Sequence, residues 1–214
     1  MRIPLSAAVI LWALSGVSVT AVAATVWDAP LLPAGTPGAA QTVPFTRVTH
    51  EVWTSRGTAH RNSTVAIQAQ CAVASYADGI PPDLLLAIAI TESGRAGRPW
   101  PWTLDVDGDP FYLPSRAALL REAQQALRNG HTRIDIGPMQ VDWRYHGALF
   151  PSLASITHPF MNIAAAGHIL AHLEARTGNW WQAVALYHSG TPTLGRPYMW
   201  HVYHIYRRLR AGRT

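Results

Sequence analysis

The segment Leu84-Leu-Leu-Ala-Ile-Ala-Ile90, followed by Thr-Glu92-Ser93, predicts a helix that is apolar on all sides. Such a helix must be enclosed by other elements, so residues 84–93 predict a packed domain around them. Pro81-Pro82-Asp83 marks its start, since proline is tolerated in a first helical turn and an acidic side chain there suits the positive end of the helix dipole. Gly94 follows the last predicted helical residue.

The rest of the chain from residue 61 onward predicts a single, mainly α domain (class α+β) with a small β-hairpin excursion. Two short extended runs, 102–106 and 111–113, flank Asp107-Gly108 and predict the hairpin. Ser115 predicts the N-terminal cap of the helix that follows it. Periodicity with start and stop signals predicts helices over 63–77, 84–93, 115–129, a short one from about 138, 159–176, 180–187 and 198–210.

The N-terminus predicts export. Residues 7–19 are almost wholly apolar, and Ala21-Val22-Ala23 supplies small residues at the spacing that signal peptidase requires. We interpret 1–23 as a signal peptide, 24–60 as an extended or disordered lead-in rich in Pro, Gly, Ala and Thr, and 61–214 as the folded domain. This places the protein in the periplasm or cell envelope. The alternative is an uncleaved anchor, the one case in which we expect a membrane contact.

The composition of the chain indicates which classes of partner it can bind. The formal charge is +5, every basic residue is arginine, and the single cysteine, Cys71, allows no internal disulfide and is predicted to be a buried small hydrophobe. A modest positive charge suits an anionic partner such as the cell wall. Basic residues do not line any stretch near the aromatic ones, so we expect no nucleic acid. The C-terminal cluster is interpreted as a solvated helix end; it consists of Arg207, Arg208, Arg210 and Arg213.

Two patterns that resemble metal sites do not meet the requirements. The segment Asp105-x-Asp107-Gly108-Asp109 starts like a calcium loop, but Arg116 stands where the closing glutamate belongs. His168 and His172 share a helix face, and no third ligand is evident nearby. We expect no metal and no cofactor.

Glu92 is singled out on physical grounds. It is the only acidic residue between Asp83 and Asp105, and it closes the apolar helix. Desolvation disfavours the charged form of a carboxyl, and the negative end of the helix dipole opposes ionisation too. Both effects raise its pKa toward the range in which a carboxylic acid donates a proton at neutral pH. Glu92 is the predicted proton donor, with a surface glutamate at a helix end as the alternative.

Four short motifs follow one another along the chain: Ala89-Ile-Thr-Glu92-Ser93, Gly137-Pro-Met139-Gln140, Pro159-Phe-Met-Asn162-Ile163 and Ala185-Leu-Tyr187-His188-Ser-Gly190. Their order resembles the soluble lytic transglycosylase family, whose fold is lysozyme-like. That family has Glu-Ser at a helix end, a Gly-x-Met-Gln turn, an Asn-Ile helix and a Tyr-Asn-x-Gly turn. The resemblance covers about residues 64–191 and implies a lysozyme-like domain here.

The resemblance implies a lyase that acts on the glycan strands of peptidoglycan, with Glu92 as the catalytic residue. Glu92 would protonate the glycosidic oxygen between N-acetylmuramic acid and N-acetylglucosamine. The same carboxylate would then act as base while the muramyl 6-hydroxyl attacks its own anomeric carbon, which gives a 1,6-anhydro sugar. Ser93 and Tyr187 would hold Glu92 through hydrogen bonds. The other residues implied to shape or support the sugar site are Gly137, Met139, Gln140, Asn162 and His188.

The chain departs from the family pattern in two places. His188 stands where the family usually has asparagine. The gap from Glu92 to Gly137 is longer than in the commonest members and holds Pro99-Trp-Pro-Trp102, whose indoles are candidates for stacking on sugar rings or for core packing. Together with Ile134-Asp135-Ile136 before the turn, this gap resembles a subgroup associated with conjugation and secretion apparatus, which implies such proteins as partners.

Asp135 is the second carboxylate of interest, because it lies two residues before Gly137. If it sits across the substrate from Glu92, a hydrolytic two-carboxylate mechanism follows and the enzyme is a muramidase. The other interpretation is a cap for the helix expected at Pro138. A further alternative keeps the fold but makes the protein a non-catalytic glycan-binding component of an assembly.

Overall fold

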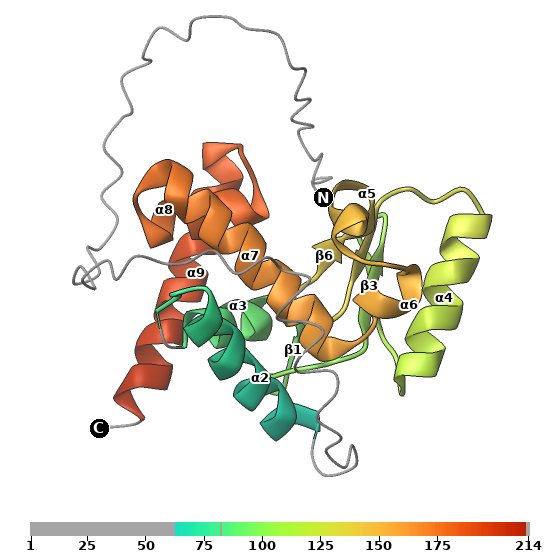
Figure 1. Ribbon diagram of the computed structural model, residues 1–214, viewed down its shortest axis with the longest axis horizontal. Coiled ribbons are helices and arrows are strands. Elements are labelled where there is room, and N and C mark those ends of the chain that lie inside the picture. The colour runs from blue at the N-terminus through green and yellow to red at the C-terminus, as the bar shows by residue number, and fades with distance from the viewer. Residues whose placement is uncertain (1–62, 82, 213–214) are drawn as a thin grey trace, which may run out of the picture.

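The computed structural model describes residues 63–81 and 83–212 of the chain (Figure 1). The predicted signal peptide, 1–23, and the predicted lead-in, 24–60, lie outside the described residues. Within the described ranges, no helix combines the length and the apolar character needed to cross a bilayer.

Helix α3 (Leu84–Ser93) forms the centre of the core, as its sequence predicts. Every side chain from Leu84 to Ala89 is buried. The helix contacts α2 (Ser63–Ala77) on one side and α9 (Pro192–Ala211) on another. Its apolar surface is therefore removed from water around its whole circumference, which favours folding in proportion to the buried area.

The helices α2, α3, α8 and α9 gather on one side of the molecule, and α7 runs from this group to the sheet, where it contacts β6 (Val141–Asp142) (Figure 1). Helix α7 (Pro159–Thr177) contacts α2 and α8 (Trp180–His188), and α8 packs on α9. Asn179 caps α8 by accepting hydrogen bonds from the Trp181 and Gln182 amides. Cys71 of α2 is buried, and this burial raises the pKa of its thiol to about 12, as suits a packed apolar side chain.

A four-stranded antiparallel sheet of order β4-β3-β5-β6 forms the other side of the molecule. Its strands are β3 (Thr103–Val106), β4 (Asp109–Tyr112), β5 (Ile134–Ile136) and β6 (Val141–Asp142). The first two form the predicted hairpin across Asp107-Gly108. The prediction of a mainly α domain with a small β excursion is confirmed, and the excursion is larger than the hairpin alone.

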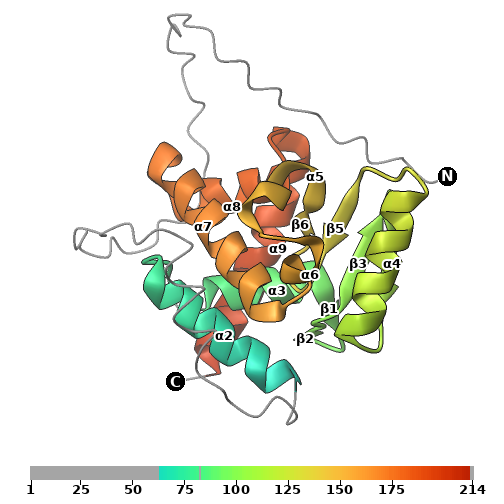
Figure 2. The same cartoon turned by 45° about the vertical axis from the view of Figure 1, so that its right-hand side comes forward.

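The two faces of this sheet differ in chemistry. Leu104, Ile136 and Val141 are directly opposite one another on adjacent strands and are buried. They lie on the face that α4 (Arg116–Arg128) covers, and α4 runs alongside β3 in Figure 2. Because side chains alternate between faces along a strand, Asp105 and the residues paired with it lie on the opposite face. That second face carries polar side chains.

Several predicted boundaries need correction. The short helix expected from Pro138 is wrong: residues 137–140 form a turn, which leads into β6. The next helix, α5 (Trp143–His146), begins after Asp142, whose carboxylate caps it. The last helix, α9, begins at Pro192, six residues before the predicted start, because proline is tolerated in a first helical turn. The remaining short segments are η1 (Gly147–Leu149) and α6 (Leu153–Ile156).

Replacing Gly195 by alanine is expected to destabilise the fold by about 1–3 kcal/mol through overpacking. A Cβ there would lie 2.7 Å from the carbonyl oxygen of Ala185 and 2.9 Å from that of Ser189, and backbone atoms cannot move aside cheaply. Gly212→Ala is the matched control at the far end of α9, where the nearest atom would be 3.7 Å away. Urea unfolding measures both; equal midpoints would contradict the close packing of α8 on α9.

Candidate active site

Glu92 lies at the C-terminal end of α3 and is partly exposed. Burial raises the pKa of its carboxyl from 4.5 to about 7, and a hydrogen bond from Tyr198 offsets part of this rise. The Tyr198 hydroxyl donates that hydrogen bond to Oε1 of Glu92 over 2.5 Å. The shifted pKa agrees with the expectation for a carboxyl that closes an apolar helix, and it leaves Glu92 able to donate a proton near neutral pH.

Tyr198 is the residue of the site that the sequence analysis missed. It lies in the first half of α9, where the sequence predicts no more than the start of a helix. Its ring stacks on the ring of His188, with centroids 4.4 Å apart and planes 4° from parallel. Desolvation lowers the pKa of His188, which favours its neutral imidazole. His188, which departs from the family pattern, therefore packs against the tyrosine that bonds to Glu92.

The predicted hydrogen bonds from Ser93 and Tyr187 to Glu92 are wrong. The Ser93 hydroxyl is fully buried and interacts with the carbonyl oxygens of Ala89 and Pro138, each at 2.9 Å. The Tyr187 hydroxyl donates to the carbonyl oxygen of Met139, also at 2.9 Å. Both side chains therefore support the turn at residues 137–140, and among the described residues Tyr198 is the one that bonds to the carboxyl.

The turn Gly137–Gln140 is fixed by buried hydrogen bonds from other segments. The Asn162 side chain, itself fully buried, donates to the carbonyl oxygen of Ile136 at 2.7 Å and accepts from the Met139 amide at 3.0 Å. The amide of Gly137 donates to the Thr103 carbonyl oxygen of β3. These bonds pair buried polar groups with one another and so restrain the conformation of the turn.

Glycine is required at position 137 for two reasons. Its φ of +81° lies in the left-handed region, and an added Cβ would lie 2.7 Å from the Asn162 side chain. Asn162 cannot withdraw, because both of its polar ends are bonded. Gln140 also has a positive φ, of 46°, and its side-chain amide donates to the Gly137 carbonyl oxygen at 2.9 Å. The backbone of this turn is thus held in an unusual conformation by its surroundings.

Residues from all four predicted motifs meet around this turn, although they are separated along the chain. Glu92 and Ser93 come from α3, the turn follows β5, Asn162 comes from α7, and Tyr187 comes from α8. The interpretation of Asp135 as a helix cap is wrong, since Asp135 is the central residue of β5.

Asp135 lies in a row of carboxylates across the sheet. It is directly opposite Asp105 of β3 and directly opposite Asp142 of β6. Desolvation raises the pKa of Asp135 to about 8, with further increases from Asp142, Asp105 and Glu92 that Arg133 partly offsets. The pKa of Tyr187 is raised mainly by burial, then by the charge of Glu92 and last by the charge of Asp135. The row therefore lies on the face of the sheet that is turned toward α3 and α8.

This arrangement limits the chemistry available at neutral pH. The two carboxyls, Glu92 with a pKa of about 7 and Asp135 with a pKa of about 8, both hold a proton for much of the time at pH 7. Glu92 can act as an acid and, once ionised, as a base. Asp135 is mostly neutral there, which makes it a poor nucleophile or base. Among the described residues, no group of three or more His, Cys, Asp or Glu side chains is arranged to hold a metal ion.

The tryptophans predicted to stack on sugars are fixed near the end of α3. The Trp100 amide donates to the Ser93 carbonyl oxygen, and its indole N–H donates to the Leu113 carbonyl oxygen at 2.8 Å. Trp102 meets Trp100 edge to face, with ring centroids 6.3 Å apart. Both indoles are partly exposed. Each ring is partly packed and partly accessible, and stacking on a sugar ring stays a prediction.

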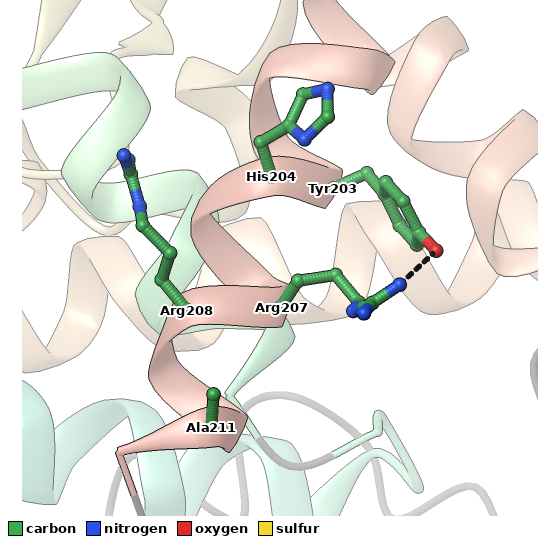
Figure 3. A pocket seen from close by; sticks show the side chains of 5 residues that line it. All are labelled: Tyr203, His204, Arg207, Arg208 and Ala211. Atoms are coloured by element: carbon green, nitrogen blue, oxygen red, sulfur yellow. Dashed lines mark hydrogen bonds between the residues drawn. The ribbon is translucent and has the colours of Figure 1, made fainter.

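A hollow on the C-terminal half of α9 is separate from this site (Figure 3). It is lined by Tyr203, His204, Arg207, Arg208 and Ala211. Arg207 lies over the Tyr203 ring and donates to its hydroxyl at 3.2 Å. No acidic side chain lines the hollow, and its arginines are exposed at the end of the helix, where positive charge suits the helix dipole.

No protein-family model, curated protein or solved structure matches this chain. The roles of the site residues therefore depend on the geometry above together with the resemblance of the motifs.

Replacing Glu92 by glutamine is expected to raise the free energy of unfolding at pH 8 by about 3 kcal/mol. Because the pKa rises from 4.5 to about 7 on folding, the folded state keeps a proton that the unfolded state has released, and stability falls as the pH rises through this window. Glutamine cannot ionise, so its advantage should vanish below about pH 4.5. Urea unfolding across this pH range tests the prediction, with Glu122→Gln on exposed α4 as control. A difference in stability that does not depend on pH would contradict the raised pKa of Glu92.

Replacing Tyr198 by phenylalanine is expected to raise the pKa of Glu92 further, because the hydrogen bond from Tyr198 lowers it. Carbon-13 NMR titration of the glutamate carboxyls would measure the midpoint. Tyr187→Phe is the matched control, since its hydroxyl donates to the Met139 carbonyl oxygen and not to Glu92. A Glu92 midpoint that moves no more in Tyr198→Phe than in the control would contradict the assigned hydrogen bond.

Proposed function

We propose that this protein is a peptidoglycan lytic transglycosylase that cleaves the β-1,4 bond between N-acetylmuramic acid and N-acetylglucosamine. The observation that carries the proposal is the meeting of four motif segments around one partly buried carboxyl. Glu92 has a pKa raised to about 7, and its hydrogen-bonding tyrosine is supported in turn by His188. A carboxyl poised to lose and regain a proton near neutral pH is what acid–base cleavage of a glycoside requires.

In the proposed reaction Glu92 begins protonated. It gives its proton to the glycosidic oxygen as the bond to the muramyl anomeric carbon breaks, and N-acetylglucosamine leaves as an alcohol. The resulting carboxylate accepts the proton of the muramyl 6-hydroxyl, whose oxygen bonds to the anomeric carbon. The products are a 1,6-anhydromuramyl end and a regenerated acid, and no water is consumed. Tyr198 stabilises the carboxylate between the two steps through its short hydrogen bond.

The charge state of Asp135 supports a lyase over a hydrolase. A hydrolytic mechanism needs a second carboxylate, either as a nucleophile or as the base that activates water. Asp135 faces the Glu92 side of the sheet, but burial and the flanking carboxylates raise its pKa to about 8. An acid that is mostly protonated at pH 7 serves poorly in either role. The muramidase alternative is therefore favoured as the pH rises and Asp135 ionises.

A non-catalytic glycan-binding role is the second alternative. A binding site has no need of a carboxyl with a pKa near neutrality, and ionising such a group weakens the fold as the pH rises. The Tyr198 and His188 arrangement that holds Glu92 is costly for a binder and useful for an acid–base catalyst. These points favour catalysis.

The proposed setting is the periplasm or cell envelope, with the glycan strands of peptidoglycan as substrate. The partner proteins proposed are those of a conjugation or secretion apparatus, for which local opening of the wall provides a passage. This link rests on the subgroup resemblance of residues 134–136 and of the long gap after Glu92. Normal DNA transfer and secretion in a strain that lacks the gene would argue against it.

Digestion of purified peptidoglycan, analysed by mass spectrometry, tests the proposed reaction. The wild type is expected to release anhydromuropeptides, and Glu92→Gln to reduce their release by a factor of about 10³ or more, since the proton donor is lost. Glu122→Gln is the matched control and should retain wild-type activity.

The products decide between the alternatives. Asp135→Asn should keep the anhydro products, because a neutral amide resembles the protonated acid. Free reducing ends that disappear in Asp135→Asn would establish the muramidase. Glycan binding by both the wild type and Glu92→Gln, with no release by either, would favour the binding component.

A further inference from the structure

The six residues from Gly94 to Pro99 form a tight hairpin directly after the proposed catalytic acid. Strand β1 (Gly94–Arg95) pairs with β2 (Arg98–Pro99), and Ala96-Gly97 forms the two-residue turn. Both turn residues have positive φ, 52° for Ala96 and 74° for Gly97, as a type I′ turn requires. A left-handed alanine costs about 1–2 kcal/mol, so the surroundings must hold this turn in place.

The hairpin places two arginines side by side. Arg95 and Arg98 are directly opposite each other in the pairing of β1 with β2, so their side chains leave the same face. Both are exposed. Two like charges at such a pair destabilise a hairpin, and neither guanidinium has a carboxylate within 4 Å among the described residues.

Arg95 is held by aromatic side chains. Its guanidinium carbon lies 5.4 Å from the ring centroid of Trp100 and 5.8 Å from that of Tyr112, within the range of cation–π interaction. Trp100 is itself fixed by its hydrogen bonds to Ser93 and Leu113. A guanidinium that rests on two rings keeps its N–H groups free at its edge and loses less side-chain entropy when it binds a ligand.

The position of Arg95 relates it to Glu92. It follows Glu92 by three residues, so their Cα atoms are at most about 11 Å apart. Tyr112, which Arg95 contacts, is directly opposite Thr103 on the sheet. Thr103 and Asp105 are two residues apart on β3, so Tyr112 shares the face that carries Asp105 and its row. The hairpin with β1 lies between α3 and this sheet (Figure 2).

We propose that Arg95, assisted by Arg98, binds a carboxylate on the muramyl side of the substrate and so selects carboxylate-bearing glycan over neutral glycan. This inference rests on the proposed function, because it names a second contact of the same substrate. The planar guanidinium offers two parallel N–H groups that match a carboxylate, and a ligand carboxylate would relieve the repulsion between the two arginines.

Two sources of carboxylate exist in peptidoglycan. The lactyl group of N-acetylmuramic acid ends in a carboxylate when the stem peptide has been removed. When the peptide is present, the lactyl group is an amide and the carboxylates belong to the peptide. N-acetylglucosamine oligomers carry neither, which makes them a neutral reference ligand with the same ring chemistry.

Calorimetric binding to the full chain carrying Glu92→Gln tests the proposal without cleavage. The ligands are a peptide-stripped muramyl tetrasaccharide, its lactyl methyl ester, a peptide-bearing tetrasaccharide and chitotetraose. Adding Arg95→Gln should weaken binding of a carboxylate-bearing ligand by about tenfold and leave chitotetraose unchanged. Arg98→Gln should act in the same direction to a smaller extent. Arg121→Gln, on exposed α4 behind the sheet, is the charge-matched control and should change nothing.

The ligands distinguish the two sources. A loss in Arg95→Gln that is confined to the stripped tetrasaccharide and absent with its methyl ester assigns the lactyl carboxylate. A loss confined to the peptide-bearing ligand assigns a peptide carboxylate. Arg95→Lys keeps the charge without the planar fork and should fall between wild type and Arg95→Gln, with thermal unfolding as the check that each variant is folded.

Equal affinities of Arg95→Gln and Arg121→Gln for every ligand would overturn the proposal. If the wild type still releases anhydromuropeptides in that case, only the carboxylate contact fails. If the chain binds neither charged nor neutral glycan and the wild type releases nothing, the proposed function fails and the inference fails with it.

Discussion

Burial of α3 is the constraint on which the rest of this structure depends. The side chains from Leu84 to Ala89 are apolar on every side of the helix, so other elements must cover the helix completely. Glu92 lies near the end of the same helix, so its carboxyl is at the edge of the core. The same packing that stabilises the fold therefore raises the pKa of Glu92. Tyr198 comes from α9, one of the helices that cover α3, so the hydrogen bond to Glu92 exists only when the core is complete.

A second, polar layer sits against this core. Ser93, Asn162 and Tyr187 come from three helices that are distant in sequence, and each bonds to the backbone of the turn at residues 137–140 or of the residue before it. Buried polar groups are tolerated only when they are paired, so each bond both satisfies a partner and fixes an orientation. The network explains why the turn can hold Gln140 at a positive φ beside Glu92's helix. Rigidity at this point follows from hydrogen bonding and not from the turn's own sequence.

Local signals were enough to predict much of the fold and part of the site. The central helix, the hairpin at Asp107-Gly108 and the Ser115 cap each have a signature within a few residues, and each is confirmed. Strands β5 and β6 are two or three residues long and exist through pairing with distant β3, so a helix was predicted near Pro138 where a turn occurs. The hydrogen-bond partners of Ser93 and Tyr187 were also wrong, because both side chains bond to the turn at residues 137–140, which is distant from them in sequence. Tyr198 lacks any neighbouring motif, and only the crossing of α9 over α3 brings it to Glu92.

Two sets of like charges near Glu92 lower the stability of the fold. Asp105, Asp135 and Asp142 are aligned across three strands, and Arg95 faces Arg98 across a hairpin. Like charges placed directly opposite each other weaken a sheet, and exchanging one member of each set would relieve the repulsion without disturbing the core. Burial and the neighbouring carboxylates raise the pKa of Asp135 to about 8, which favours its protonated form at neutral pH. The two arginines cannot reduce their repulsion by losing a proton, because a guanidinium stays protonated. Both guanidinium groups are exposed to solvent, and an anionic group on a ligand beside Glu92 would reduce the repulsion between them.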